Sequence, residues 1–235
     1  MTTFALVHGA WHGSWCWERV TPLLEQRGHR VVAVDLPCDD VNATVDTYAD
    51  LVATALDGVG ADPVVLVGHS FAGQTIPLVA ERTRVDKLVY LCALVPIPGC
   101  SFIELLTREP DTLLPEYLSG VGFDGEGRMV WVDEAVARSV FYADCEPEIA
   151  TAAFERLRPQ APAAQTDPCP LEDYPPVATT YVVCADDRIA NPVRSRAVAT
   201  HRLRANLAEL PGGHSPFLSR PRDLAELLHH EAEAP

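Results

Sequence analysis

One short segment of the chain, residues 68–72 with the sequence GHSFA, constrains the fold more than any other part of the sequence. It directly follows the apolar run at residues 63–67 and directly precedes a helix-like stretch at residues 73–82. A short apolar run before a turn signal is typical of a buried strand. Small residues on both sides of Ser70 let a strand and a helix approach closely. The segment therefore predicts a serine at a tight strand-to-helix turn, the arrangement called a nucleophile elbow.

Short apolar runs alternate with amphipathic stretches along much of the chain. The runs, which we expect to form strands, occupy residues 4–7, 30–35, 63–67, 85–94, 179–184 and 207–210. The stretches with helical spacing occupy residues 15–26, 47–56, 73–82 and 221–231. Strands that are apolar throughout and alternate with helices favour a mostly parallel sheet covered on both faces. The pattern predicts an α/β fold.

The alternation of strands and helices is interrupted between the fourth and fifth of the expected strands. Residues 96–176 contain no convincing buried strand, but they do contain helical pieces near residues 102–106, 132–142 and 148–157. We therefore predict an α/β core made of residues 1–95 and 177–235, with residues 96–176 inserted as a helical cap. Such a cap would cover the carboxyl edge of the sheet, where parallel sheets carry their binding sites.

Composition excludes several classes of partner. The formal net charge of −15 argues against nucleic acid and against anionic membrane surfaces. The seven cysteines are scattered without a CxxC pair, which disfavours a disulfide framework and a structural zinc site. There is no basic N-terminal targeting segment, and no apolar run approaches the roughly 18 residues of a membrane span. We expect a cytoplasmic protein with no nucleic-acid or membrane partner.

A serine hydroxyl becomes a useful nucleophile only when a base takes its proton and an acid orients that base. Downstream of a nucleophile elbow the chain order is Asp or Glu, then His. His214, in a glycine-rich loop before the last helix, is the candidate base. The acid is Asp186 or Asp187, just past the strand at 179–184, and we favour Asp187. The other histidines fit less well. They lie in the first loop (His8 and His12), inside the elbow (His69), before a strand (His29) and on helix-like stretches that we expect to be solvated (His201, His229 and His230).

An attacked carbonyl also needs donors for its developing negative charge. The elbow supplies the backbone N–H of Phe71, and the loop after the first strand supplies a second, for which we favour Ala10. Trp11 is interpreted either as core or as a wall of the substrate pocket. Trp131, in the insertion, is interpreted either as core or as an aromatic group facing the substrate. Phe141 and Ser215 are assigned to the same pocket.

Five segments of the chain resemble the plant-type methylesterase and hydroxynitrile lyase family of α/β hydrolases. They are residues 4–17 (FALVHGAWHGSWCW), 68–73 (GHSFAG), 140–145 (VFYADC), 184–189 (CADDRI) and 212–217 (GGHSPF). The resemblance implies the α/β-hydrolase fold and a triad of Ser70, Asp187 and His214. It also implies that neither a metal nor an organic cofactor is needed. Ala72 departs from the glycine usual at that place of an elbow, but it removes no catalytic group.

Two positions distinguish the chemistries within that family. Lyases of this type carry Thr where this chain has Gly9, and Lys where it has Ser215. The resemblance therefore implies an esterase that acts on small carboxylic esters, such as methyl esters of aromatic or isoprenoid-like acids. Alternatives on the same scaffold are a lactonase, a C–C hydrolase, a hydroxynitrile lyase, or a small-molecule-binding protein with little turnover. Contacts through the cap or the sheet edge leave room for a homodimer.

Overall fold

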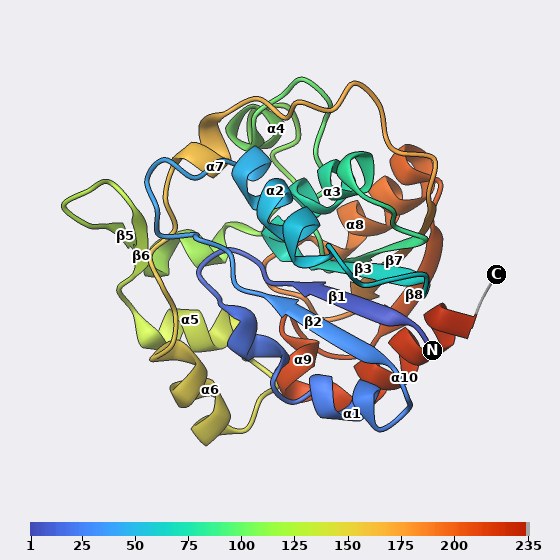
Figure 1. Ribbon diagram of the computed structural model, residues 1–235. Helices are drawn as coiled ribbons and strands as arrows, with labels where there is room; N and C mark the ends of the chain where they lie inside the picture. The colour runs from blue at the N-terminus through green and yellow to red at the C-terminus, as the bar shows by residue number, and fades with distance from the viewer. Residues whose placement is uncertain (234–235) are drawn as a thin grey trace.

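A computed structural model describes residues 1–233 of the chain. Its centre is a six-stranded sheet with the order β2-β1-β3-β4-β7-β8, in which every neighbouring pair is parallel (Figure 1). The strands are β1 (Thr3–Val7), β2 (Arg30–Val34), β3 (Val64–His69), β4 (Lys87–Leu91), β7 (Ala178–Cys184) and β8 (Asn206–Leu210). The expected parallel sheet is confirmed.

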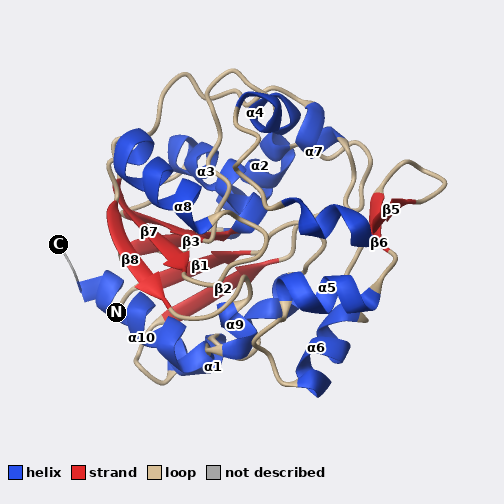
Figure 2. Ribbon diagram, turned by 180° about the vertical axis from the view of Figure 1, so that it is seen from behind, coloured by secondary structure: helices blue, strands red, loops and turns tan. Residues whose placement is uncertain are grey.

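Helices cover both faces of this sheet, as Figures 1 and 2 show from opposite sides. One face carries α2 (Val45–Ala55), α3 (Ile76–Arg82) and α8 (Pro192–Ala197). The other carries α1 (Thr21–Glu25), α9 (Pro216–Ser219) and α10 (Pro221–Glu233). Every residue of β1, β3 and β4 is buried, whereas the edge strands β2 and β8 are partly exposed. The apolar runs of the central strands are therefore explained by burial between two helical layers.

The segment between β4 and β7 extends beyond the carboxyl ends of the strands and then returns over the helices to the start of β7 (Figure 1). It contains α4 (Phe102–Arg108), η3 (Pro115–Gly120), β5 (Val121–Phe123), β6 (Met129–Trp131), α5 (Glu134–Phe141), α6 (Pro147–Phe154) and α7 (Ala163–Thr166). The helices α4, α5 and α6 correspond to the expected pieces, whereas η3 and α7 were not expected. The antiparallel hairpin of β5 and β6 was not expected from the sequence, because three-residue strands leave too short a pattern to recognise. The division into a core and a cap stays a prediction.

The continuous helix expected at residues 15–26 is wrong. The structure has a single 3-10 turn, η1 (Ser14–Trp17), followed by the separate short helix α1. Pro22 occupies the first turn of α1, where its missing N–H is tolerated, but it would interrupt the hydrogen bonds of a longer helix. The stretch expected as helix at 73–82 likewise begins as a 3-10 turn, η2 (Ser70–Gln74), before α3.

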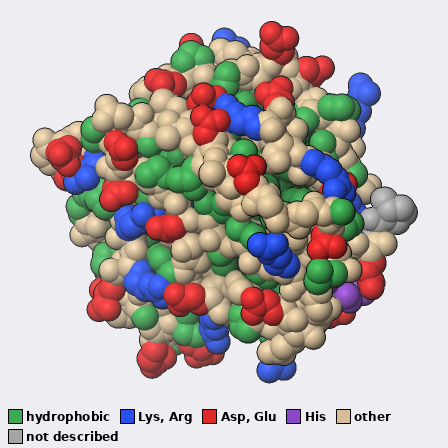
Figure 3. All heavy atoms as spheres, viewed as in Figure 1, with side chains coloured by type: hydrophobic (Ala, Val, Ile, Leu, Met, Phe, Trp, Pro, Cys, Tyr) green, Lys and Arg blue, Asp and Glu red, His purple; other side chains and the backbone are tan. Residues whose placement is uncertain are grey.

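The surface and the cysteines agree with an ordinary globular domain. The face drawn in Figure 3 shows acidic side chains spread among arginines and small apolar areas. All seven cysteines are free thiols, and all but Cys145 are buried. Within residues 1–233, no helix combines the length and the apolar character needed to cross a bilayer.

Candidate active site

Ser70 lies where the buried strand β3 turns into η2. Its φ angle is +53°, in the left-handed region that non-glycine residues rarely adopt. Such a backbone costs about 1–3 kcal/mol and persists only where its surroundings enforce it. The first loop packs closely against this turn, since a Cβ added to Gly9 would lie 2.7 Å from the Ser70 Cβ. This geometry is that of a nucleophile elbow at the carboxyl edge of the sheet.

The small residues around Ser70 are not equivalent. A Cβ on Gly68 would lie 2.7 Å from the Cγ2 of Ile76, and one on Gly73 would lie 2.7 Å from the carbonyl oxygen of Leu94. Both positions therefore need glycine for close approach. Ala72 is itself 1% exposed and fits its place, and its carbonyl accepts the N–H of Thr75 at 2.9 Å. The departure at Ala72 is accommodated by packing.

His214 and Asp187 form a buried hydrogen-bonded pair. The loop after β8 carries His214 and the loop after β7 carries Asp187, so both reach the edge that presents Ser70. His214 Nδ1 donates to Asp187 Oδ2 at 2.8 Å. The second carboxylate oxygen accepts the N–H groups of Ile189 at 2.7 Å and Ala190 at 3.1 Å. Three donors thus hold this carboxylate in place, and it in turn holds the imidazole.

The neighbouring carboxylate, Asp186, points elsewhere. It is exposed, and its Oδ2 accepts the backbone N–H of Gly212 at 3.2 Å. It therefore braces the glycine-rich loop that carries His214 and does not contact the imidazole within the described hydrogen bonds. Of the two candidate acids, the structure brings Asp187 to His214.

The other imidazole nitrogen of His214 is left available. With its proton on Nδ1, Nε2 carries a lone pair; this atom is buried and has no hydrogen-bond partner among residues 1–233. The hydrogen bond from the Ser70 hydroxyl is thus not yet formed. Such bonds are often long in ligand-free enzymes and tighten when substrate binds. His214 is placed beside the elbow by His69, whose Nε2 donates to the His214 carbonyl at 2.8 Å.

Three further histidines are buried at this edge of the sheet. His8, His12 and His69 are each fully buried. Burial lowers the pKa of His8 to about 4 and that of His12 to about 3, and it holds the pKa of His69 well below its usual value. All three are therefore neutral near pH 7, and each acts through its hydrogen bonds.

The first loop brings Ala10 to the elbow, together with Phe71 on the far side of Ser70. Ala10 is 9% exposed and Phe71 is 4% exposed. Trp11, the next residue of the loop, has a φ angle of +62°, an outlier for a bulky side chain. Gly9, the residue before Ala10, packs against Ser70, and Phe71 directly follows Ser70 in the chain. The roles of the Ala10 and Phe71 N–H groups as oxyanion donors stay a prediction.

Three aromatic residues from separate segments pack together near His214. The ring of Trp131 lies 5.7 Å from that of Trp11 and 4.9 Å from that of Phe141, between centroids. The Phe141 ring lies 5.7 Å from the His214 ring. These three residues thus form an aromatic cluster, which contacts the imidazole through Phe141. Their role in lining a substrate pocket stays a prediction. Ser215 is fully buried beside His214, and its hydroxyl has no partner among the described residues.

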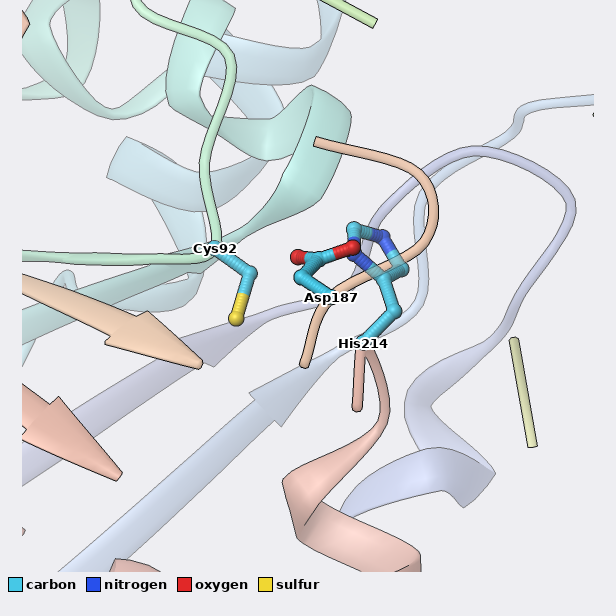
Figure 4. A group of neighbouring side chains, drawn as sticks. All are labelled: Cys92, Asp187 and His214. Atoms are coloured by element: carbon cyan, nitrogen blue, oxygen red, sulfur yellow. The ribbon is translucent and has the colours of Figure 1, made fainter. Parts of the chain in front are cut away.

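Cys92, which its apolar strand-like run predicts to be a small core residue, is buried and lies against the acid. Its Sγ and the ligand atoms of Asp187 and His214 all lie within 4.8 Å of one another, and Figure 4 shows the carboxylate between the thiol and the imidazole. These are residue types that hold a zinc ion. Burial raises the pKa of the Cys92 thiol well above its usual value. A protonated thiol and a carboxylate already bonded to histidine fit an acid–base pair better than a metal centre.

Comparison with known proteins relates nearly the whole chain to one family. Residues 4–227 match the alpha/beta hydrolase family. Norfluorocurarine synthase 1 from Strychnos sp is 29% identical, covering 98% of this chain and 95% of its own length. Methylesterase 2 of Arabidopsis thaliana is 28% identical, and the match covers 96% of this chain and 94% of that relative. A solved pyrethroid hydrolase from Sphingobium faniae JZ-2 is 27% identical with a TM-score of 0.81, covering 100% of this chain and 98% of that one.

Proposed function

We propose that this chain, which belongs to the alpha/beta hydrolase family, is a serine hydrolase of small carboxylic esters. The observation that carries the proposal is the buried Asp187–His214 hydrogen bond beside a serine held at a left-handed strand-to-helix turn. The fold alone hosts many reactions, so the argument rests on this site. Relatives that bear the names methylesterase and pyrethroid hydrolase support it.

Acylation follows from the positions of the three side chains. Ser70 Oγ attacks the ester carbonyl carbon while its proton passes to His214 Nε2, the nitrogen left without a partner. Asp187 stabilises the imidazolium that forms and keeps the tautomer that makes Nε2 the base. The backbone N–H groups of Ala10 and Phe71 bind the oxyanion, and one such donor is worth about 2.7–4 kcal/mol of barrier.

Collapse of the tetrahedral intermediate and a second attack complete the cycle. The C–O bond to the alcohol breaks as His214 returns its proton to the leaving oxygen, which leaves an ester between Ser70 and the acyl group. A water molecule then attacks this acyl-enzyme, with His214 as the base, and releases the carboxylic acid. Ser70 regains its proton, so the residues end as they began.

The aromatic cluster suggests the kind of ester that fits. Phe141 lies against His214, and Trp11 and Trp131 pack around Phe141. Apolar rings in this place favour a flat or branched apolar acyl group over a charged one. We propose methyl esters of aromatic or isoprenoid-like acids as the first substrates to screen.

A lyase is the main alternative, and Gly9 counts against it. A side chain added at this position would start 2.7 Å from the Ser70 Cβ, so the threonine found there in lyases of this type does not fit the present backbone. Ser215 likewise supplies no positive charge for a departing cyanide. Release of benzaldehyde and cyanide from mandelonitrile would favour the lyase.

The test is hydrolysis of p-nitrophenyl acetate and butyrate by the wild-type protein and by Ser70→Ala. We expect wild-type turnover that Ser70→Ala loses, while circular dichroism and the unfolding midpoint stay unchanged. Equal hydrolysis by both proteins would contradict the assigned nucleophile. Tight binding of an ester without turnover by the wild type would favour the binding-protein alternative.

A further inference from the structure

The loop after β1 has four successive carbonyl groups bound as hydrogen-bond acceptors. His8 Nδ1 donates to the Gly9 carbonyl at 2.8 Å, and His12 Nδ1 donates to the Ala10 carbonyl at 2.9 Å. Arg158 supplies the donors for the next two. Its backbone N–H donates to the Trp11 carbonyl at 2.7 Å, and its guanidinium donates to the His12 carbonyl from Nη2 at 2.9 Å and from Nε at 3.2 Å.

These bonds fix the direction of the N–H groups as well as that of the carbonyls. The peptides of residues 1–233 are trans, so each C=O points opposite to the N–H of the same peptide. The carbonyl of Gly9 faces His8, and the N–H of Ala10, which shares that peptide, therefore points away from His8. Rotation of this one peptide plane would remove the proposed oxyanion donor.

The loop does not hold this shape on its own intrinsic preference. Trp11 adopts a φ angle of +62°, which a bulky residue reaches only when surrounding contacts enforce it. Arg158 binds the carbonyl of this strained residue and that of His12, and the Cys38 thiol adds a longer contact of 3.7 Å to the His12 carbonyl. Tyr142 makes one further contact that holds this loop, because its hydroxyl donates a hydrogen bond to His12 Nε2 at 2.9 Å.

Arg158 is itself anchored on a second loop. Its Nη2 also donates to the carbonyl of Leu36 at 2.9 Å, just past β2, and its Nη1 lies 3.5 Å from the Asp35 carboxylate. The side chain is 27% exposed. A planar guanidinium can bind two carbonyls and a carboxylate at fixed angles, which the compact ammonium of lysine cannot do. One side chain from the end of the 96–176 segment thus ties the loop after β1 to the loop after β2.

We propose that Arg158 is a positioning residue of the oxyanion hole, a role that rests on the proposed esterase function. It touches neither Ser70 nor His214 within the described hydrogen bonds. It acts by holding the Trp11 and His12 carbonyls, so that the strained loop keeps the Ala10 N–H directed at the reacting oxygen. Its removal should therefore weaken transition-state binding more than substrate binding.

The test compares Arg158→Ala with a matched control, Arg156→Ala. Arg156 lies two residues earlier and pairs through both Nη atoms with Glu18 at the surface, without touching the loop carbonyls. Steady-state hydrolysis of p-nitrophenyl butyrate gives kcat and KM. Inhibition by butylboronic acid, which forms a tetrahedral adduct on serine, reports the oxyanion hole, and inhibition by butyrate reports ground-state binding.

Loss of a whole oxyanion donor costs about 10²–10³ in kcat, and we expect Arg158→Ala to lose about 10–100-fold because the Ala10 N–H is misdirected but still present. The boronate Ki should rise by the same factor, while KM and the butyrate Ki change less than about threefold. Added guanidinium ion should restore part of kcat, and Arg158→Lys should fall between wild type and Arg158→Ala. Arg156→Ala should behave as wild type.

The outcomes separate this proposal from the one on which it rests. Suppose that the wild type and Arg156→Ala hydrolyse the ester and that Arg158→Ala has the same kcat and boronate Ki as the wild type. This result would overturn the positioning role and leave the esterase function intact. Equal rises in KM, butyrate Ki and boronate Ki would also overturn it, because they indicate general damage to the pocket. If Arg158→Ala does not fold, Arg158→Lys carries the same comparison. No hydrolysis by the wild type would overturn both proposals.

Discussion

Moderate acid should destabilise this protein well above the pH at which carboxylates take up protons. His8, His12 and His69 are fully buried, and burial lowers their pKa, to about 4 for His8, to about 3 for His12 and well below the usual value for His69. An unfolded histidine has a pKa of about 6.5. The unfolded chain binds these protons more tightly. The contribution of the three neutral histidines to the unfolding free energy is therefore fully present above pH 6.5, and it is lost as the pH falls toward the folded pKa values.

The size of the effect follows from the same values. Between pH 7 and pH 5 an unfolded histidine becomes almost fully protonated, whereas His8 and His12 remain neutral in the fold. Each of these two histidines then costs about 2 kcal/mol of unfolding free energy over this interval, about 4 kcal/mol together, and the lowered pKa of His69 adds to this loss. A domain of this kind has a total stability of about 5–15 kcal/mol. The loss is therefore large enough to bring the protein close to unfolding at pH 5.

Urea unfolding at pH 7, 6, 5.5 and 5 measures this directly. The slope of the unfolding free energy against pH should correspond to about two protons taken up near pH 5 by His8 and His12, with a further contribution from His69. The variant His8→Gln, which keeps a side-chain N–H donor, should reduce the uptake by about one proton. An uptake below one proton at pH 5 in the wild type would refute the account of neutral buried histidines.

Three other results are expected. Asp187→Asn should lower kcat by about 10⁴, as loss of the correct histidine tautomer does in other triads, whereas Asp186→Asn should change steady-state kcat less than tenfold. Gly73→Ala should lower the free energy of unfolding, measured with urea, by about 1–3 kcal/mol, because the new Cβ would lie 2.7 Å from a backbone oxygen. Gly125→Ala is the control and should leave this free energy unchanged, because nothing lies within 4 Å of its Cβ. Iodoacetamide at pH 8 should label Cys92 only after unfolding, because burial raises its pKa; peptide mapping that finds rapid labelling of the folded protein would contradict this.

The sequence predicts most of the core because its signals are local. A buried strand is apolar throughout, and the elbow needs small residues within a few positions of Ser70. The pairing of Asp187 and His214 at the edge that presents Ser70 could be anticipated although these residues are far apart in sequence, because parallel strands bring their carboxyl ends to one edge. Asp186 and Asp187 could not be separated by pattern alone, and only the direction of each side chain distinguishes them.

The polar framework of the site was missed because it is made by long-range contacts. Arg158 reaches the carbonyls of Leu36 and His12 across more than a hundred residues, and an isolated arginine in a proline-rich segment gives no local sign of this. His8 and His12 are buried because the insertion and the loops close over them, which a loop sequence does not reveal. The short strands β5 and β6 escaped notice for a different reason, since three residues carry no readable alternation.

The central claim is that Ser70 forms a covalent acyl intermediate, with His214 as its base. The most direct measurement is mass spectrometry of the protein quenched in acid during turnover of p-nitrophenyl butyrate, followed by peptide mapping. The account predicts a butyryl adduct on the peptide that contains Ser70, absent in Ser70→Ala and also absent or slow to form in His214→Ala. A wild-type protein that turns the ester over with no adduct, or with an adduct on another residue that persists in Ser70→Ala, would contradict it.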